Sequence, residues 1–309
     1  MTTPVILDCD PGHDDAIALL LALASPELEL LGVTTVSGNQ TVDKTTANAI
    51  RVLDHVGRDD IPVAAGATRP LAREQHAAAA VHGESGLDGP DLPPPSRRPA
   101  PEHAIDWIAQ TIEASPAPVT LVPTGPLTNI ALLLARYPGL ERRLKRIVLM
   151  GGAIGEGNTT PAAEFNVWAD PEAAHRVLSS GLDVTMVGLD VTHQALMTQA
   201  HADRLAGAGR AGRLVADLYG FYVEFHRQRY GWDGVPVHDA VAVAHLIDPT
   251  LLSIKHCGVV VDTGPEPSRG RTHVDRWGRP GWTPNCHVAV DIDAERFLEL
   301  LVERITRLG

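Results

Sequence analysis

Cysteine is scarce in this chain, with three residues in 309, at positions 9, 257 and 286. An odd number at wide, irregular spacing fits neither a framework of disulfide bonds nor the paired spacing of a zinc site. Lysine is equally rare, at positions 44, 145 and 255. At 44% hydrophobic and 21% charged residues, the composition is that of a globular protein with ample material for a core.

A long apolar run and an excess of positive charge are also absent. The longest apolar stretch, Ala16–Ala24, is far too short to cross a bilayer. Residues 1–4 lead straight into strand-like residues, without the basic and apolar regions of a signal peptide, so we expect a cytoplasmic protein. A formal charge of −12 argues against nucleic acid or an anionic membrane surface as the main partner.

Short β-type runs alternate with helical runs, a pattern that predicts βαβ units and a largely parallel sheet. The expected strands are 5–8, 28–36, 62–65, 119–122, 147–150, 184–187, 258–261 and 288–290. The expected helices are 15–23, 41–56, 103–114, 127–136, 171–179, 213–230, 238–247 and 294–308. We predict an α/β protein with a doubly wound, mostly parallel sheet and helices on both faces, in a single domain over 1–309. Residues 87–101 and 263–286, rich in proline or glycine, are expected to be loops.

The most informative segment is Asp-Cys-Asp-Pro-Gly-His-Asp-Asp at 8–15, which follows an apolar strand. Asp8 and Asp10 end this strand, Pro-Gly turns the chain, and Asp14 and Asp15 open a helix, where the helix dipole favours negative charge. Carboxylates this close repel one another unless a cation or a hydrogen-bond network holds them. Oxygen ligands of this kind suit Ca²⁺ or Mg²⁺.

Further polar or site-forming residues lie at or just beyond the ends of other expected strands: Asn39, Thr124 and Met150. In a doubly wound sheet these ends meet at one edge, so residues far apart in sequence can surround one pocket. Asp239 would join them from the start of a helix. On the residues alone, Asn39 and Thr124 could equally be turn residues and Met150 a core residue.

Seven segments together resemble the nucleoside hydrolases, the inosine-uridine preferring family. They are Asp-Cys-Asp-Pro-Gly-His-Asp-Asp-Ala at 8–16, Gly-Asn-Gln at 38–40, His-Gly-Glu-Ser-Gly at 82–86, Val-Pro-Thr-Gly-Pro-Leu-Thr-Asn at 122–129, Leu-Met-Gly-Gly at 149–152, Glu-Phe-Asn at 164–166 with Asp170-Pro171 beyond, and Val-His-Asp at 237–239. The segments occur in the family's order and at its spacings, and they cover nearly the whole chain. One such motif would be a weak signal, whereas seven in order are specific.

The resemblance implies a Rossmann-like fold and hydrolysis of the N-glycosidic bond of ribonucleosides, to free base and ribose, with preference for inosine and uridine. It implies one Ca²⁺ per chain, with Mg²⁺ less favoured, held by Asp10, Asp15, Asp239 and the backbone carbonyl of Thr124. The cation would activate the attacking water, and Asp10 would serve as general base. His238 would protonate the leaving base. Homodimers or homotetramers are expected.

The substrate-binding residues that the resemblance implies are Asp14, Asn39, His82, Met150, Asn158, Glu164, Asn166, His238 and Asp239. Asp14, Asn166 and Asp239 would bind the ribose 2′- and 3′-hydroxyls, and Asn158 and Glu164 the 5′-hydroxyl. Read without the resemblance, the loop that carries Asn158, Glu164 and Asn166 would be a solvated one, and His82 an ordinary loop histidine.

One departure from the family pattern concerns base preference. Inosine-uridine members tend to place a tyrosine about twelve residues before the histidine of Val-His-Asp, where this chain has His226. Tyr230 and Trp232 lie nearby and could supply an aromatic surface instead. A hydrolase restricted to pyrimidine ribonucleosides is therefore the main alternative. A phosphatase of the haloacid dehalogenase type and an inactive nucleoside-binding protein are remote alternatives.

Overall fold

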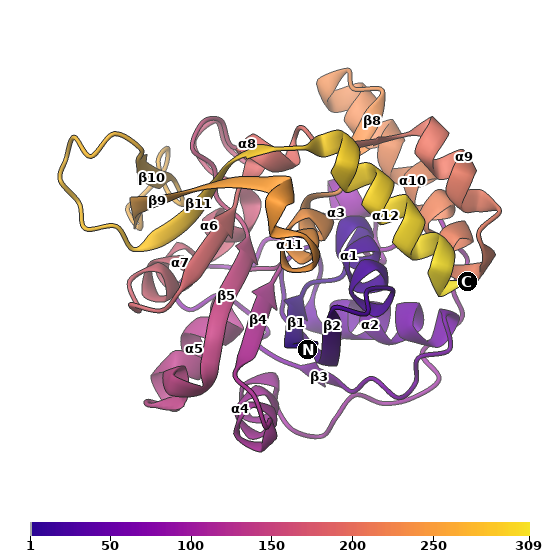
Figure 1. Cartoon of the computed structure of the whole chain (residues 1–309), viewed down its shortest axis with the longest axis horizontal. Coiled ribbons are helices and arrows are strands. Elements are labelled where there is room, and N and C mark those ends of the chain that lie inside the picture. The colour runs from indigo at the N-terminus through magenta and orange to yellow at the C-terminus, as the bar shows by residue number, and fades with distance from the viewer. Residues whose placement is uncertain (1) are drawn as a thin grey trace.

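The computed structural model describes residues 2–309, which are built around one nine-stranded sheet with the order β10-β9-β11-β6-β5-β4-β1-β2-β3 (Figure 1). The strands are β1 (Thr3–Cys9), β2 (Leu28–Thr35), β3 (Val63–Ala65), β4 (Val119–Pro123), β5 (Leu144–Met150), β6 (Val184–Val187), β9 (Leu252–Val261), β10 (Thr272–Asp275) and β11 (Cys286–Ile292). All neighbours from β3 to β11 are parallel, and β9 runs antiparallel to β11 and β10. The predicted mostly parallel α/β sheet is confirmed.

Helices cover both faces of the sheet (Figure 1). One face packs against α1 (His13–Leu23), α2 (Val42–His55), α9 (Gln199–Ala206), α10 (Gly209–Tyr230), α11 (His238–Ile247) and α12 (Ala294–Leu308). The opposite face packs against α4 (Ala104–Ala114), α5 (Thr128–Arg136) and α7 (Pro171–Leu178). The apolar stripe of α12, including Phe297 and Leu301, is buried as its helical spacing requires. No described helix is long and apolar enough to cross a membrane.

The order of the strands creates a crevice beside β1. The chain adds β2 and β3 on one side of β1, and β4, β5 and β6 on the other, so the direction of winding reverses between β1 and β4. Ligands of open α/β sheets bind at the carboxyl ends of the strands where the direction reverses. Asp10 directly follows β1 and Thr124 directly follows β4, so both lie at this point.

The structure corrects the expected loop at 263–286. This segment contains β10, which pairs with β9 over Thr272–Asp275, and it ends at the first residue of β11. The hydroxyl of the buried Thr272 donates to the carbonyl of Ala153 and accepts from its amide, which ties the segment to the loop after β5. The strand β10 has only four residues, and glycines, prolines and arginines surround it. A strand this short does not produce a recognisable alternation of apolar and polar residues.

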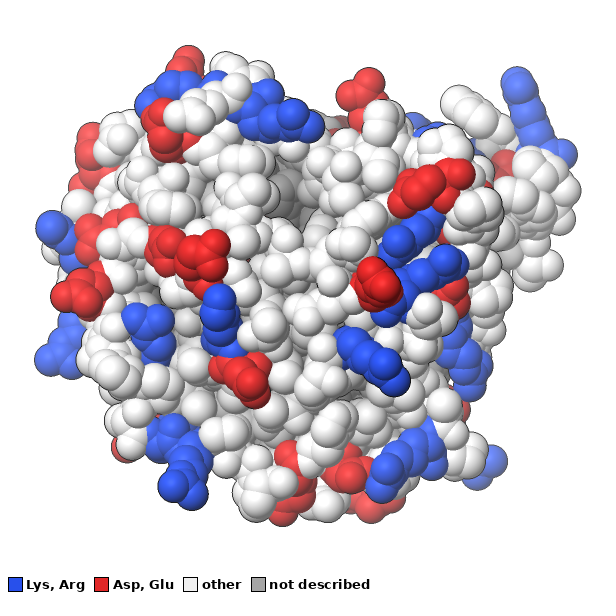
Figure 2. Space-filling view, turned by 180° about the vertical axis from the view of Figure 1, so that it is seen from behind, with Lys and Arg blue, Asp and Glu red and all other residues white. Residues whose placement is uncertain are grey.

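Several other short elements were not predicted. They are the two-stranded antiparallel sheet of β7 (Leu196–Thr198) and β8 (Gly234–Pro236), the helix α9, and the short helices α3 (Ala79–His82), α6 (Phe165–Ala169) and α8 (Leu189–Thr192). The proline-rich segment 87–101 is mostly irregular, as expected, with one isolated bridge between Ala64 and Ala100. Acidic and basic side chains alternate over the face shown in Figure 2, without a large area of one sign.

Candidate active site

The turn after β1 places Asp10 and Asp15 in one hydrogen-bond network. The amide of Asn39 donates to Asp10 Oδ2 at 2.6 Å, and the Asn39 side chain donates to the Asp10 carbonyl at 3.2 Å and to Asp15 Oδ2 at 3.1 Å. Asp15 also accepts from the Gly12 amide at 3.0 Å and from the Thr124 hydroxyl at 2.9 Å. Asn39 and Thr124 therefore connect the ends of β1, β2 and β4.

Two more carboxylates complete an acidic floor. Asp14 and Asp15 lie in the first turn of α1 and Asp239 in the first turn of α11, and one oxygen atom from each lies within 4.8 Å of the others. All three are buried, as is Asp10. The structure thus groups Asp14 with Asp15 and Asp239, with Asp10 next to them through the Asn39 network.

The electrostatics of this floor are those of a site that could hold a cation. Burial, followed by repulsion from neighbouring carboxylates, raises the pKa of Asp10 and Asp239 well above the usual range. Among residues 2–309, no salt bridge involves the floor carboxylates. Asp10 Oδ1 is buried and has no hydrogen-bond partner. A buried, unpartnered carboxylate oxygen beside three further carboxylates fits a hard divalent cation.

Asn166, a residue of α6, links two strand ends. Its amide nitrogen donates to the Thr124 carbonyl at 2.7 Å and to the Met150 carbonyl at 3.2 Å. Because a side-chain amide has separate donor and acceptor atoms, this leaves the Asn166 carbonyl oxygen free of these bonds. The carbonyl oxygen of Thr124 has two lone pairs, and the hydrogen bond from Asn166 uses one of them. The second lone pair can still ligate a cation.

Glu164 is held by backbone amides of its own helix and of the loop after β5. Its carboxylate accepts from the amides of Asn166, Val167 and Gly152 at 2.8, 3.1 and 2.9 Å and caps the N-terminus of α6. Burial nonetheless raises its pKa. Asn158 Oδ1 accepts from the amide of Phe165 at 3.0 Å, which closes the loop onto α6. The polar residues 158–166 therefore form an ordered edge of the site.

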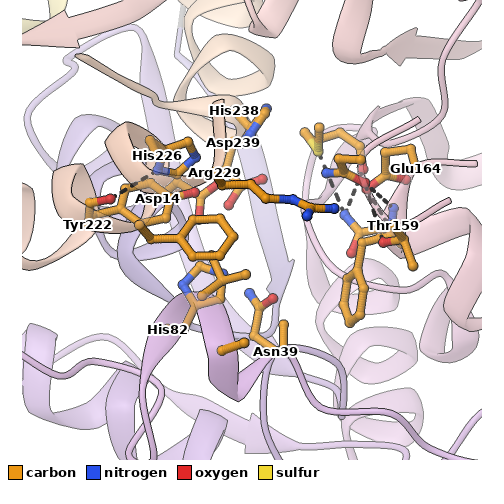
Figure 3. A pocket seen from close by; sticks show the side chains of 18 of the residues that line it. Asp14, Asn39, His82, Thr159, Glu164, Tyr222, His226, Arg229, His238 and Asp239 are labelled. Atoms are coloured by element: carbon orange, nitrogen blue, oxygen red, sulfur yellow. Dashed lines mark hydrogen bonds between the residues drawn. The ribbon is translucent and has the colours of Figure 1, made fainter. Parts of the chain in front are cut away.

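A cavity of about 520 Å³ lies above the acidic floor. In Figure 3, Glu164 and Thr159 lie on one side of this cavity, and Tyr222 and His226 lie on the other. The substrate-binding residues expected from the sequence all line it: Asp14, Asn39, His82, Met150, Asn158, Glu164, Asn166, His238 and Asp239. The volume is in the range that small-molecule sites occupy.

An aromatic wall, formed by Tyr222, His226, Tyr230 and Trp232 at the end of α10 and just beyond it, faces the polar edge. The rings of Tyr230 and Trp232 are stacked at 4.6 Å between centroids, and that of His226 stacks on Trp232 at 6.0 Å. Tyr222 meets the ring of His226 edge-on at 4.4 Å. Such a surface can pack against a planar aromatic group.

Burial favours the neutral form of three cavity histidines, His82, His226 and His238. Burial lowers the pKa of His82 and His238 well below the usual range, and it lowers the pKa of His226 to about 4. His238 Nδ1 lies 2.7 Å from the hydroxyl of Thr192, a residue of α8. His82 Nδ1 accepts from the backbone amide of His13 at 3.2 Å.

Comparison with known proteins agrees with this geometry. The profile of the inosine-uridine preferring nucleoside hydrolases matches residues 5–299. The chain belongs to this family. It is 52% identical over 307 residues to pyrimidine-specific ribonucleoside hydrolase RihA of Shewanella sp. strain ANA-3, covering 99% of this chain and 96% of that protein. It is 50% identical over 311 residues to RihA of Salmonella arizonae, covering all of both chains. It also resembles the solved purine-preferring ribonucleoside hydrolase of Gardnerella vaginalis, with a TM-score of 0.93, 34% identity and 99% of each chain covered.

This nucleoside hydrolase is therefore an enzyme that hydrolyses N-glycosyl bonds of ribonucleosides. Several cavity residues were not predicted from its sequence. They are His76, Thr159, Phe165, Trp168, His193, Tyr222, Phe225 and Arg229. Most lie on helices or loops whose polar or aromatic residues have no fixed spacing, so no sequence signal distinguishes them from surface residues.

One buried side chain beside the site joins several strand ends. Asn129, a residue of α5, donates to Asp8 Oδ1 at 2.8 Å and to the Thr35 carbonyl at 3.0 Å, and it accepts from the Ala67 amide at 2.8 Å. It thus fastens three strand ends beneath the floor.

Proposed function

We propose that this enzyme hydrolyses pyrimidine ribonucleosides to free base and ribose with the help of a bound divalent cation, Ca²⁺ in preference to Mg²⁺. The observation that carries the proposal is one cavity with a buried, uncompensated acidic floor on one side and an aromatic wall on the other. The high identity to proteins named pyrimidine-specific supports the pyrimidine preference over the broader inosine-uridine preference.

Asp10, Asp15, Asp239 and the Thr124 carbonyl would hold the cation, and Asp14 lies within reach of the same group. When bound, such a cation lowers the pKa of a coordinated water and so supplies a nucleophile at neutral pH. Asp10 would take the proton from the attacking water. Its Oδ2 is occupied by the Asn39 amide, whereas its Oδ1 has no partner, so Oδ1 is the accepting atom.

The polar edge and the floor would bind the sugar. Asp14, Asp239 and the free oxygen of Asn166 would receive hydrogen bonds from the 2′- and 3′-hydroxyls, and Asn158 and Glu164 would bind the 5′-hydroxyl. Buried carboxylates around the ribose also stabilise the positive charge that develops on the sugar as the bond breaks.

The aromatic wall would pack against the base, with His82 and His238 at its edge. His238 would donate a hydrogen bond or a proton to the departing base, and the Thr192 hydroxyl at Nδ1 orients its ring for that role. Asn39 acts as a positioning residue for Asp10 and Asp15, and Met150 lines the sugar side. No covalent enzyme nucleophile is required.

Release of ribose from uridine, cytidine, inosine and adenosine tests the proposal. We expect turnover of the two pyrimidine nucleosides, much weaker turnover of the purines, and loss of all turnover after chelation with recovery on adding Ca²⁺. Equal rates on inosine and uridine would favour the broader inosine-uridine preference. Absence of turnover on every nucleoside would favour the nucleoside-binding alternative. The phosphatase alternative does not survive the membership of the chain in the nucleoside hydrolase family.

We also propose that the enzyme acts as a homodimer or homotetramer. The support is the resemblance to the nucleoside hydrolase family. Light scattering on the purified protein measures the assembly directly, and a monomer at micromolar concentration would contradict this expectation.

A further inference from the structure

His226 stands where the family pattern leads one to expect tyrosine, and its ring is fixed at one edge. Its Nδ1 lies 3.0 Å from the backbone carbonyl of Tyr222, four residues earlier on α10. Figure 3 shows both residues on the same wall of the cavity. A carbonyl oxygen can only accept a hydrogen bond, so Nδ1 must carry the ring proton.

The opposite edge of the ring carries Nε2. The side chain is 4% exposed and lines the cavity, and the rings of Tyr222 and Trp232 contact it from two directions. Among residues 2–309, no side chain or backbone group forms a hydrogen bond with Nε2. Burial keeps the pKa of His226 at about 4, so the ring holds one proton, on Nδ1, at neutral pH. Nε2 therefore presents a lone pair.

We propose that His226 is a specificity-determining residue that accepts, through Nε2, a hydrogen bond from a ring N–H of the base. The preferred substrates are then nucleosides whose base carries such a group, as uracil does at its position 3. Cytosine has no hydrogen on the ring nitrogen at position 3. In the same placement, the lone pair of that nitrogen would face the lone pair of Nε2, and no hydrogen bond could form. This inference rests on the proposed function, because it assigns the base to the wall that contains His226.

The expected size of the preference follows from a mismatched polar contact. A site built to pair with an N–H discriminates against an analogue that lacks it, because the buried polar groups remain unpaired. Neutral hydrogen bonds of this kind change a rate by roughly 10- to 100-fold. We therefore expect kcat/KM for uridine to exceed that for cytidine by about this factor.

Two substitutions test the assignment. In His226→Gln, the side-chain amide can rotate to present either its oxygen or its NH₂ group, so the ratio of kcat/KM for uridine to cytidine should approach one. In His226→Phe, the ring and its stacking on Trp232 persist without any nitrogen, so the ratio should again approach one while both values fall. His193→Gln is the matched control, because His193 also lines the cavity and contacts Trp232. Unlike His226, the ring of His193 forms no hydrogen bond with a backbone group of residues 2–309. This variant should keep the wild-type ratio.

The outcomes separate this inference from the proposed function. A wild-type enzyme that releases ribose from uridine and cytidine equally well would overturn the role of His226 and leave the hydrolytic function intact. Retention of the wild-type ratio in His226→Phe would also overturn it. A wild-type enzyme that releases ribose from no nucleoside would overturn the proposed function and this inference together. Circular dichroism and the melting temperature confirm that each variant is folded, and His226→Gln alone decides the matter if the phenylalanine variant is not.

Discussion

The two sides of the cavity are built in different ways. On the floor and the polar edge, backbone amides hold the carboxylates: Asn39 donates to Asp10, Gly12 donates to Asp15, and three amides donate to Glu164 on the edge. On the aromatic wall, side chains position one another by ring contacts, and His226 alone of its four rings is tied to the backbone. The floor thus follows from the path of the chain at the strand ends, whereas the wall follows from the choice of side chains at one helix end.

This difference explains how one fold can serve several bases. We expect the exchange of a side chain at the outer part of the wall to leave the sheet and the floor unchanged, because Tyr230 and Trp232 lie at the surface and stack on each other and on His226. Relatives with the same fold carry names that state different base preferences, pyrimidine-specific in one case and purine-preferring in another. We therefore expect floor variants to affect all substrates equally and wall variants to change the ratios between substrates.

The largest expected effect is on the floor. Asp10→Asn keeps an oxygen that can accept from the Asn39 amide but removes the ability of this side chain to accept a proton. Loss of a general base costs roughly 10²–10⁴-fold in kcat. Uridine, cytidine and inosine should lose the same factor, measured by ribose release at saturating Ca²⁺. A different factor for each base would show that floor and wall do not act separately.

The floor was largely predictable from the sequence, and the reason is physical. Asp10, Asn39 and Thr124 each follow a strand, and parallel strands bring their carboxyl ends to one edge. Eight of the sheet's strands were also predicted in whole or in part, because most of them are buried parallel strands, which are short apolar runs. The strand β10 was not predicted, since its four residues lie in a segment rich in glycine, proline and arginine.

The wall was predictable only in part. His226, Tyr230 and Trp232 were noticed because His226 departs from the family pattern, but Tyr222 was not. Ring stacking depends on where α10 ends relative to β8, and no local pattern encodes that distance. The same limit applies to Asn129 and Thr192, whose partners Asp8 and His238 lie 121 and 46 residues away. Contacts of this range come from topology rather than from spacing.

The second prediction concerns the leaving base at the wall. His238→Ala should slow the hydrolysis of uridine by about 10²-fold or more, because the base of uridine must be protonated as the bond breaks. The rate of hydrolysis of p-nitrophenyl riboside should fall much less, since its leaving group needs no proton. Both rates are measured on one purified variant after its affinity for Ca²⁺ has been checked. Equal losses on the two substrates would assign His238 to orienting Asp239, its neighbour in sequence.

Cation binding should stabilise the floor by a smaller amount. Ligand at one hundred times its dissociation constant adds about 2.7 kcal/mol to the free energy of unfolding. Chelated protein should therefore melt at a higher temperature after Ca²⁺ is added, with Mg²⁺ less effective and Na⁺ at equal ionic strength as the control. Asp15→Asn should lose this gain, whereas His226→Gln should keep it. An unchanged melting temperature in the wild type would argue against a resident cation.

The smallest effect is the response of the wall to acid. Burial lowers the pKa of His226 to about 4 in the folded protein, whereas an unfolded histidine titrates near 6.5. The unfolded chain thus binds this proton more tightly, so His226 contributes stability that is fully present above pH 6.5 and is lost as the pH falls toward 4. The shift corresponds to at most about 3 kcal/mol, and because the ring borders a cavity we expect about 1–2 kcal/mol.

Urea unfolding of the wild type and His226→Gln at pH 7 and pH 4.5 measures this contribution to the free energy of unfolding. The glutamine variant should lose less stability over this interval than the wild type does. An identical loss of unfolding free energy in both proteins would contradict the prediction. It would mean that water in the cavity solvates the protonated ring of His226.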